Sequence, residues 1–448
     1  MAGSVPFKPT DDWRSWGGVE RAAHRVATPL HDNQLIAALS ALDGRDDDCL
    51  AVGLGRSYGD TCINPGEAIL DMTGLDRFIA FDPEAGTLRA QAGVSLFDIL
   101  ALIIPYGFYL PTTPGTRYVT LGGAIANDVH GKNHVSAGTF GRHVRRIGLI
   151  RSDGTRIELG PEDNSGLFAA TISGLGLTGV IAWAEVSLAR IPSSTIRQQV
   201  RVFANLDEFF DLSEAHGETH EHAVAWVDCL AKGKNLGRGI YSFGDWDEDG
   251  SLEVHPKPKG VAFPLEAPGF LLNRFSLSAF NSLYYRLNAS RAGPSTVAYD
   301  KFFYPLDAIR NWNRMYGRRG FYQYQSVVPP ETARDATREM LSIIAASGTG
   351  SFLAVLKMFG AKPSPGYLSF PMEGVTLALD FPNQGKKTLE LLGALDRVVM
   401  QANGRLYPAK DGRMPRAMFE TGYDRLDAFK THIDPGLGSA FWNRMTHP

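Results

Sequence analysis

Residues 111–144 read PTTPGTRYVTLGGAIANDVHGKNHVSAGTFGRHV, a stretch in which small residues alternate with polar ones. The small residues leave room for the backbone to pass close to another group: Gly115, Gly122, Gly123, Ala124, Ala126, Gly131, Ala137, Gly138 and Gly141. The polar side chains between them are Thr116, Thr120, Asn127, Asp128, His130, Lys132, Asn133 and Ser136. This composition favours the wall of a site for a large, flat, phosphate-bearing cofactor that takes many backbone hydrogen bonds.

The histidines of this stretch do not form a metal-binding pattern. His130 and His134 are four residues apart, but the glycine between them disfavours one helical face, and no cysteine is near. A second histidine cluster, EAHGETHEH at 214–222, lacks the His-Glu-x-x-His order of a zinc protease. We therefore predict no metal site, and we interpret the 214–222 cluster as a solvated polar face.

A second glycine loop, GLGRSYGD, follows a predicted strand at 53–60. Three glycines after a strand are typical of a loop whose N–H groups approach a phosphate. The spacing is neither the dinucleotide fingerprint, since no helix follows, nor a P-loop, since Gly-Lys-Ser/Thr is absent. From these residues alone, a phosphate-binding loop and a tight structural turn both remain open.

Length and composition limit the class of protein. A chain of 448 residues favours two domains, and 44% hydrophobic with 21% charged residues is typical of a globular protein. The net charge of −3 gives no basic surface for nucleic acid. Cys49, Cys62 and Cys229 form no disulfide pattern, and neither a signal peptide nor a membrane-spanning run is evident.

Hydrophobic periodicity predicts alternating strands and helices in the first 190 residues. Strands are expected at 50–55, 67–72, 87–93 and 177–191, with a hairpin over 144–159 that turns at Asp153-Gly154. Ser95 is expected to cap a helix that Gly107 ends, and Asn164 to open one that runs to Thr171.

The second half of the chain changes in texture. Residues 235–298 are rich in Gly, Pro and Ser and predict long loops, either a mobile lid or an insertion without function. From 321, a β-α-β-β-α-β order predicts a ferredoxin-like antiparallel sheet that ends in a strand over RLYPAK (405–410). Lys357 lies within the apolar strand SFLAVLKMF, where burial would require a charged partner or an anionic ligand.

Five segments, in order from about residue 50 to 415, resemble the decaprenylphosphoryl-β-D-ribose 2′-oxidase family, within the vanillyl-alcohol-oxidase (PCMH-type) FAD-binding oxidoreductases. They are GLGRSYGD, PGTRYVTLGGAIANDVHGKNH, WNRMYGRRGFYQYQ, SFLAVLKMFG and GRLYPAKDGR. The resemblance implies an α+β fold in which a two-subdomain PCMH-type FAD-binding domain accompanies an antiparallel-sheet (ferredoxin-like) substrate domain. The expected boundaries are 1–193 for the FAD domain, 194–404 for the substrate domain, and 405–448 for a segment that returns to the FAD domain.

The resemblance also implies the cofactor contacts. The expected FAD-binding residues are Gly53, Gly55, Arg56, Ser57, Tyr58, Gly59, Asp60, Cys62, Gly115, Thr116, Thr120, Leu121, Gly122, Gly123, Asn127, His130, Gly131, Ile181, Tyr407 and Lys410. Many relatives attach flavin through a histidine in the first glycine loop, where this chain has Arg56, so we expect non-covalent FAD.

The same resemblance assigns the reacting groups. Lys410, His130 and Tyr58 are the expected catalytic residues, with Lys410 either accepting the hydroxyl proton or stabilising reduced flavin as a cation. The expected substrate-binding residues are Lys132, Trp226, Tyr304, Gln323, Gln325, Lys357 and Ala378. Mycobacterial members carry a cysteine at the position of Ala378, which predicts retained activity with a different pocket shape and a different response to thiol-directed inhibitors. A second departure is Asn127, where those members carry another cysteine.

The implied activity is FAD-dependent oxidation of a secondary sugar hydroxyl, C2 of a polyprenyl-phosphoryl-β-D-ribose, as the first half of an epimerisation to arabinose in cell-wall arabinan synthesis. The alternatives are an oxidase of a soluble polyol, aldonolactone or other sugar derivative on the same scaffold, and a flavin-free binding protein. The expected partners are a lipid-linked or free sugar, a short-chain reductase and a membrane surface touched peripherally. The expected location is cytoplasmic or peripheral at the inner membrane, with the periplasmic side left open by the family.

Overall fold

The computed structural model describes residues 5–42, 48–255, 263, 266 and 272–446. Its first sheet has the order β1-β2-β4-β3, with β1 (Lys8–Arg14) antiparallel to β2 (Arg21–Ala27). The strands β3 (Cys49–Val52) and β4 (Ala68–Asp71) run parallel to each other, and α1 (Asp32–Ser40) connects β2 to β3. Both parallel strands are buried, as their continuous apolar runs predict.

A second sheet, antiparallel throughout, has the order β5-β6-β10-β8-β9. Its strands are β5 (Phe78–Asp82), β6 (Thr87–Gln91), β8 (Val144–Ile150), β9 (Arg156–Leu159) and β10 (Val180–Ser187). The predicted hairpin around Asp153-Gly154 is confirmed. Between β6 and β8 the chain forms α2 (Leu96–Ile103), β7 (Phe108–Tyr109), α3 (Leu121–Ala126) and α4 (His134–Ala137). The expected cap is also confirmed, since Ser95 Oγ accepts the Asp98 N–H at 3.1 Å and Gly107 follows with φ 76°.

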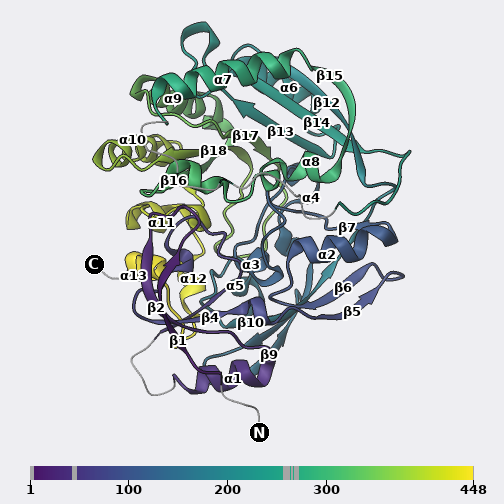
Figure 1. The fold of residues 1–448 in the computed structure, drawn as a ribbon, viewed down its shortest axis with the longest axis vertical. Helices are drawn as coiled ribbons and strands as arrows, with labels where there is room; N and C mark the ends of the chain where they lie inside the picture. The colour runs from purple at the N-terminus through teal and green to yellow at the C-terminus, as the bar shows by residue number, and fades with distance from the viewer. Residues whose placement is uncertain (1–4, 43–47, 256–262, 264–265, 267–271, 447–448) are drawn as a thin grey trace.

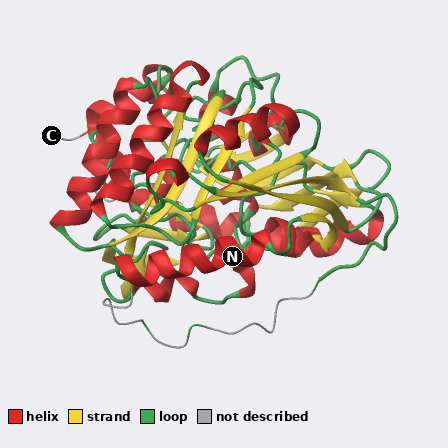
Figure 2. Ribbon diagram, turned by 90° about the horizontal axis from the view of Figure 1, so that it is seen from above, coloured by secondary structure: helices red, strands yellow, loops and turns green. Residues whose placement is uncertain are grey.

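The third sheet has eight strands in the order β15-β12-β14-β13-β17-β18-β16-β19. They are β12 (Thr195–Phe203), β13 (His222–Val227), β14 (Gly239–Trp246), β15 (Gly293–Ala298), β16 (Phe321–Val328), β17 (Ala354–Phe359), β18 (Gly374–Pro382) and β19 (Arg405–Leu406). The helices α6 (Leu206–His216), α9 (Pro330–Ser347) and α10 (Lys386–Gln401) share one hydrophobic core with alternate residues of these strands. The predicted β-α-β-β-α-β order after residue 321 is confirmed. Figure 2 shows the strands running between flanking helices.

The segment 235–298 differs from the predicted loops. It contains β14, β15 and a 16-residue helix, α7 (Arg274–Ala289), which has a capping box at Asn273 and Ser276. The helix α7 lies against β12 and β14 and buries Leu277 and Asn281, so tertiary packing supports a helix despite the polar composition. Parts of the expected lid, 256–262, 264–265 and 267–271, lie outside the described residues.

Three shorter predictions were wrong in detail. RLYPAK is a two-residue strand followed by a 3-10 turn, because Pro408 cannot donate to the sheet. The helix expected from Asn164 is α5 (Leu167–Thr171), since the Asp163 carboxylate holds the preceding turn. The 214–222 cluster is not wholly solvated, because His222 in β13 is buried and His216 stacks on Phe243 at 4.3 Å.

The C-terminal residues return to the first sheet, where the yellow helices lie beside purple strands in Figure 1. Here α11 (Arg416–Gly422), α12 (Leu426–Lys430) and α13 (Ala440–Thr446) follow one another. The Ala440 N–H donates to the Ile63 carbonyl at 2.8 Å, and Leu437 forms a bridge with Cys49. No helix in the described ranges is long and apolar enough to cross a membrane.

Candidate active site

A cavity of about 1480 Å³ lies where the two glycine-rich segments face the eight-stranded sheet. Its lining comes from residues 51–62, 113–132 and 175–181, from the sheet strands β12 to β18, and from the turn 407–410. Pockets for single small ligands usually measure about 300–1,000 Å³. The cavity is therefore large enough for a dinucleotide-sized cofactor and a second ligand beside it.

The first glycine loop presents unused hydrogen-bond donors to this cavity. Among the described residues, no acceptor is found for the backbone N–H groups of Leu54, Gly55, Arg56 and Ser57, which all line it. Gly55 has φ +60°, a conformation that few other residues adopt. Consecutive free N–H groups in such a loop form a concave site for an anion, so the loop fits the diphosphate of FAD.

The second segment packs directly on the first. A Cβ at Gly53 would lie 2.2 Å from Thr120 Oγ1, so only glycine permits the two segments to touch. Thr120 Oγ1 in turn accepts the Gly123 N–H at 3.1 Å and caps α3. This contact fixes the width of the cofactor site from both sides.

His130 is held in one tautomer by the sheet. Its Nε2 lies 2.9 Å from the amide Nε2 of Gln325, which can only donate. Burial, followed by the charge of Lys357, lowers the pKa of His130 well below its usual value, so the ring is neutral. The proton therefore sits on Nδ1, a buried atom without a partner among the described residues, and this donor is available to a bound ring system.

Besides the exposed Lys301, three lysines line the cavity without carboxylate partners among the described residues. Within the described chain, no acidic side chain lies within ion-pair distance of Lys132, Lys357 or Lys410. Burial lowers the pKa of Lys132 to about 7, and of Lys357 and Lys410 to about 8. Lys357 donates to the Gly131 carbonyl at 3.3 Å, and Lys410 Nζ lies 4.0 Å from the centre of the Tyr58 ring. The cluster suits an anionic ligand and provides amines that can be neutral near pH 8.

Asp380 is a cavity residue that the sequence predictions omitted. Its Oδ1 accepts the Gln323 amide at 2.9 Å, and burial raises the pKa of its carboxyl to about 7. Its negative charge opposes the effect of burial on Lys410 by raising the pKa of that lysine. The period of two in GVTLALDF places Asp380 on the same face as Ala378, which was the signal that could have identified it.

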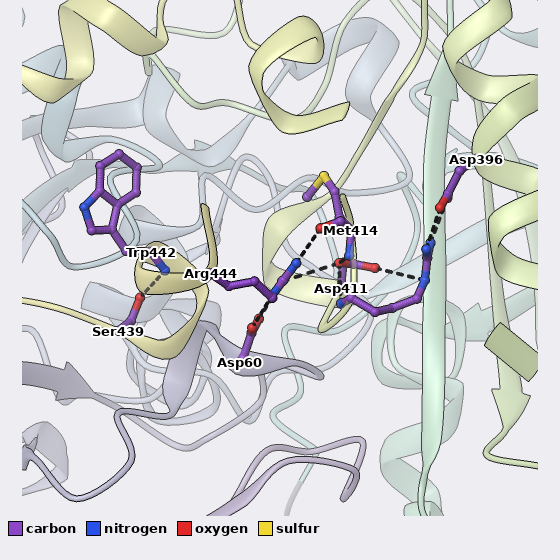
Figure 3. A network of polar contacts seen from close by, with 8 residues as sticks. Asp60, Asp396, Asp411, Met414, Ser439, Trp442 and Arg444 are labelled. Carbon is purple, nitrogen blue, oxygen red and sulfur yellow. Dashed lines mark hydrogen bonds and ion pairs between the residues drawn. The ribbon is translucent and has the colours of Figure 1, made fainter. Parts of the chain in front are cut away.

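The turn that carries Lys410 is fixed by a buried ion network, shown in Figure 3. Arg444 donates to both carboxylate oxygens of Asp60, at 2.8 and 3.1 Å, and to the Met414 carbonyl. Arg444 also lies 3.7 Å from Asp411, which is linked through Arg413 to Asp396.

The same turn packs on the first glycine loop. The Tyr58 N–H donates to the Ala409 carbonyl at 3.0 Å, and a Cβ on Gly59 would lie 2.0 Å from the Asp411 carbonyl oxygen. Lys410 is thereby positioned beside the cofactor loop.

Most of the predicted site residues line this one cavity. Those that do are Gly53, Gly55, Arg56, Ser57, Tyr58, Cys62, Gly115, Thr116, Thr120, Gly122, Gly123, Asn127, His130, Gly131, Lys132, Ile181, Trp226, Gln323, Gln325, Lys357, Ala378, Tyr407 and Lys410. Gly59, Asp60, Leu121 and Tyr304 lie behind the lining. Asp60 faces Arg444, and the Tyr304 hydroxyl is 2.8 Å from that of Tyr109, so both support the wall from outside.

Arg56 occupies the loop position on which the expectation of non-covalent FAD rests. Its guanidinium lies 3.9 Å from the centre of the Trp16 ring, and its Nε donates to the Tyr118 carbonyl at 3.1 Å. A guanidinium that stays protonated is no nucleophile, so this position offers no covalent link to the cofactor. The free donors of the loop, the Nδ1–H of His130 and the cavity lysines together fit the diphosphate and ring system of FAD.

Comparison with known proteins gives consistent results. A family model described as "FAD binding domain" matches residues 23–160. The chain is 36% identical over 438 residues to decaprenylphosphoryl-beta-D-ribose oxidase of Mycolicibacterium smegmatis, covering 94% of each protein. It is 26% identical over 206 residues to L-gulono-1,4-lactone dehydrogenase of Mycobacterium tuberculosis, or 44% of this chain and 46% of that protein. It is also 28% identical over 172 residues to L-gulonolactone oxidase of Mus musculus, or 36% and 38%.

Proposed function

The chain belongs to the decaprenylphosphoryl-β-D-ribose oxidase family of FAD-binding oxidoreductases, and we propose that it oxidises C2 of a polyprenyl-phosphoryl-β-D-ribose to the 2-keto sugar. That it is an FAD-dependent oxidoreductase of sugar-type substrates follows from the family itself. The C2 position and the lipid-linked ribose are the proposed part. Bound FAD would supply the hydride acceptor for the carbinol carbon, and the two glycine-rich segments would hold it.

The cavity lysines without a carboxylate partner among the described residues are the observation that carries the proposal. A phosphoryl sugar is an anion, and Lys132 and Lys357 offer it positive charge that no carboxylate in the described part of the chain neutralises. A neutral polyol or lactone gives such cations no partner. The charge of the cavity therefore favours the phosphorylated sugar over the soluble polyol or aldonolactone.

The residues then divide the chemistry between them. Lys410 Nζ takes the hydroxyl proton when it is neutral, since burial lowers its pKa to about 8. Gln323 orients the sugar through its buried Oε1, which lacks a donor among the described residues. His130 donates from Nδ1 toward the cofactor side of the cavity and stays neutral throughout.

Two associations belong to the same proposal. The 2-keto product requires a reductase to complete an epimerisation, and a short-chain reductase is the expected partner. A membrane contact is proposed at α7, where Phe275, Leu283 and Leu287 are 85%, 57% and 47% exposed. Apolar side chains in such a row on one helix suit a lipid surface.

The test is a substrate screen on the purified, flavin-loaded protein under anaerobic conditions. We expect flavin bleaching by a polyprenyl-phosphoryl-β-D-ribose but not by xylitol or gulonolactone, and acid release of the flavin. Bleaching by gulonolactone alone would establish the soluble-substrate alternative. A colourless protein that takes up no FAD would contradict the cofactor assignment.

A further inference from the structure

One face of the eight-stranded sheet forms a continuous floor for the cavity. Gln325, Ala378, Val355, Trp226 and Ile240 are direct cross-strand neighbours, each on the next strand from β16 to β14. All of them line the cavity, and the floor continues onto β12. Six strands at about 4.8 Å spacing give a floor about 24 Å wide.

The chemistry of this floor changes along its width. The end on β16, β18 and β17 carries Gln323, Asp380 and Lys357. On β13, β14 and β12 the described lining side chains are uncharged and mainly apolar: Val224, Trp226, Ile240, Ser242, Gln198 and Val200. Among the described residues, the charged side chains of the floor, Asp380 and Lys357, thus lie at its β16–β17 end.

The helix α7 covers the apolar end of the floor. Its buried Leu277 and the partly exposed Phe280 and Tyr284 line the cavity together with Leu272. The Tyr284 ring lies 4.7 Å from that of Trp226, where the apolar and polar ends meet. We call the space between α7 and strands β12 to β14 the apolar arm. Its walls are mainly apolar, with Ser276 and Asn288 on α7 and Gln198 and Ser242 on the sheet as polar exceptions, and the lysine cluster lines the same cavity.

We propose that the apolar arm binds the long hydrocarbon chain of an amphiphilic substrate whose anionic sugar lies at the lysine end. The inference rests on the proposed function, which it deepens by placing the chain. Apolar cavities of this kind bind apolar ligands, because water gains few hydrogen bonds there. A peptide is a poor occupant, since its backbone N–H and C=O groups would lack partners in the arm.

Chain binding can be measured without catalysis. Holoenzyme is titrated with 11-(dansylamino)undecanoic acid, whose fluorescence rises on transfer to an apolar site, and the probe is displaced with butyl, octyl and dodecyl phosphate. Affinity should increase by about fourfold for each methylene buried until the arm is filled. Equal displacement by butyl and dodecyl phosphate would overturn the proposal.

Variants locate the bound chain. Val224→Trp places a large side chain in the arm and should weaken the binding of dodecyl phosphate at least tenfold. If that variant loses flavin, Val200→Phe is a milder substitution that should weaken the binding in the same direction. The matched control is Leu389→Ser on α10, an apolar side chain that is 43% exposed and does not line the cavity, and this variant should bind the probe as the parent does. Unchanged affinity in both Val224→Trp and Val200→Phe would place the chain outside the arm and refute the inference.

Substrate pairs separate this inference from the proposed function. Flavin reduction is compared for farnesyl-phosphoryl-β-D-ribose and methyl-phosphoryl-β-D-ribose. A lower KM for the farnesyl compound that is lost in Val224→Trp supports both statements. Equal KM values would refute binding of the hydrocarbon chain in the arm while leaving the proposed sugar oxidation intact. Chain binding without flavin reduction by either sugar would support the arm and refute the proposed reaction.

Discussion

The pH dependence of flavin reduction depends on the amine of Lys410. Burial lowers its pKa from 10.5 to about 8, so at pH 7 the neutral fraction is about 10%, against about 0.03% for an ordinary lysine. The site thereby raises the population of the free amine roughly 300-fold. If this amine accepts the substrate proton, the anaerobic reduction rate should rise with pH, with a midpoint near 8, and level off above about 9.

Asp380 provides a second, directional test of this assignment. Its carboxylate raises the pKa of Lys410, so Asp380→Asn should lower that pKa further and move the midpoint to lower pH. Lys410→Met should reduce the rate by about 10²–10⁴-fold and remove the dependence near pH 8. The exposed Lys430→Met is the matched control and should retain the parent profile.

The assay is stopped-flow flavin bleaching between pH 6 and 10, with flavin content measured for each variant. A rate that falls as pH rises through 8 would refute the base role, because it would require the protonated amine. A midpoint that moves upward in Asp380→Asn would refute the proposed coupling of the two side chains.

Three further predictions concern the architecture around the site. Arg444→Met should lower the free energy of unfolding by about 3–5 kcal/mol in urea titrations, because it leaves Asp60 buried without its partner. The control Arg416→Met, at an exposed ion pair, should lower it by under about 1 kcal/mol. Equal effects of the two variants would contradict a stabilising role for the Arg444–Asp60 ion pair. Gly59→Ala should abolish tight FAD binding in titrations of the apoprotein, because its Cβ meets the Asp411 carbonyl. The control Gly393→Ala, in open space on α10, should leave the free energy of unfolding unchanged or raise it by up to about 1 kcal/mol. Gln325→Leu should weaken FAD binding about fivefold or more, because it leaves Nε2 of His130 without a hydrogen-bond donor. An unchanged affinity for FAD would show that this hydrogen bond is dispensable.

Local patterns were sufficient for much of the secondary structure. The alternation in TLRAQAG, the Ser95 cap and the helix stop at Gly107 each depend on residues a few positions apart, and each was confirmed. The segment 235–298 was misread because composition suggested loops, while α7 forms through packing against β12 and β14. Lys410 was expected at a strand end but lies in a 3-10 turn that begins at Pro408.

Local patterns were enough to predict the two glycine loops, the order of the elements after residue 321 and the family, because steric freedom at glycine and hydrophobic period are properties of neighbouring residues. The tertiary structure was needed to show that Lys132, Lys357 and Lys410 share one cavity without a carboxylate partner within ion-pair distance among the described residues, and that Asp380 joins them. These side chains come from positions up to nearly three hundred residues apart. Their pKa values arise from burial and from charges brought together by the sheet, which no local pattern encodes.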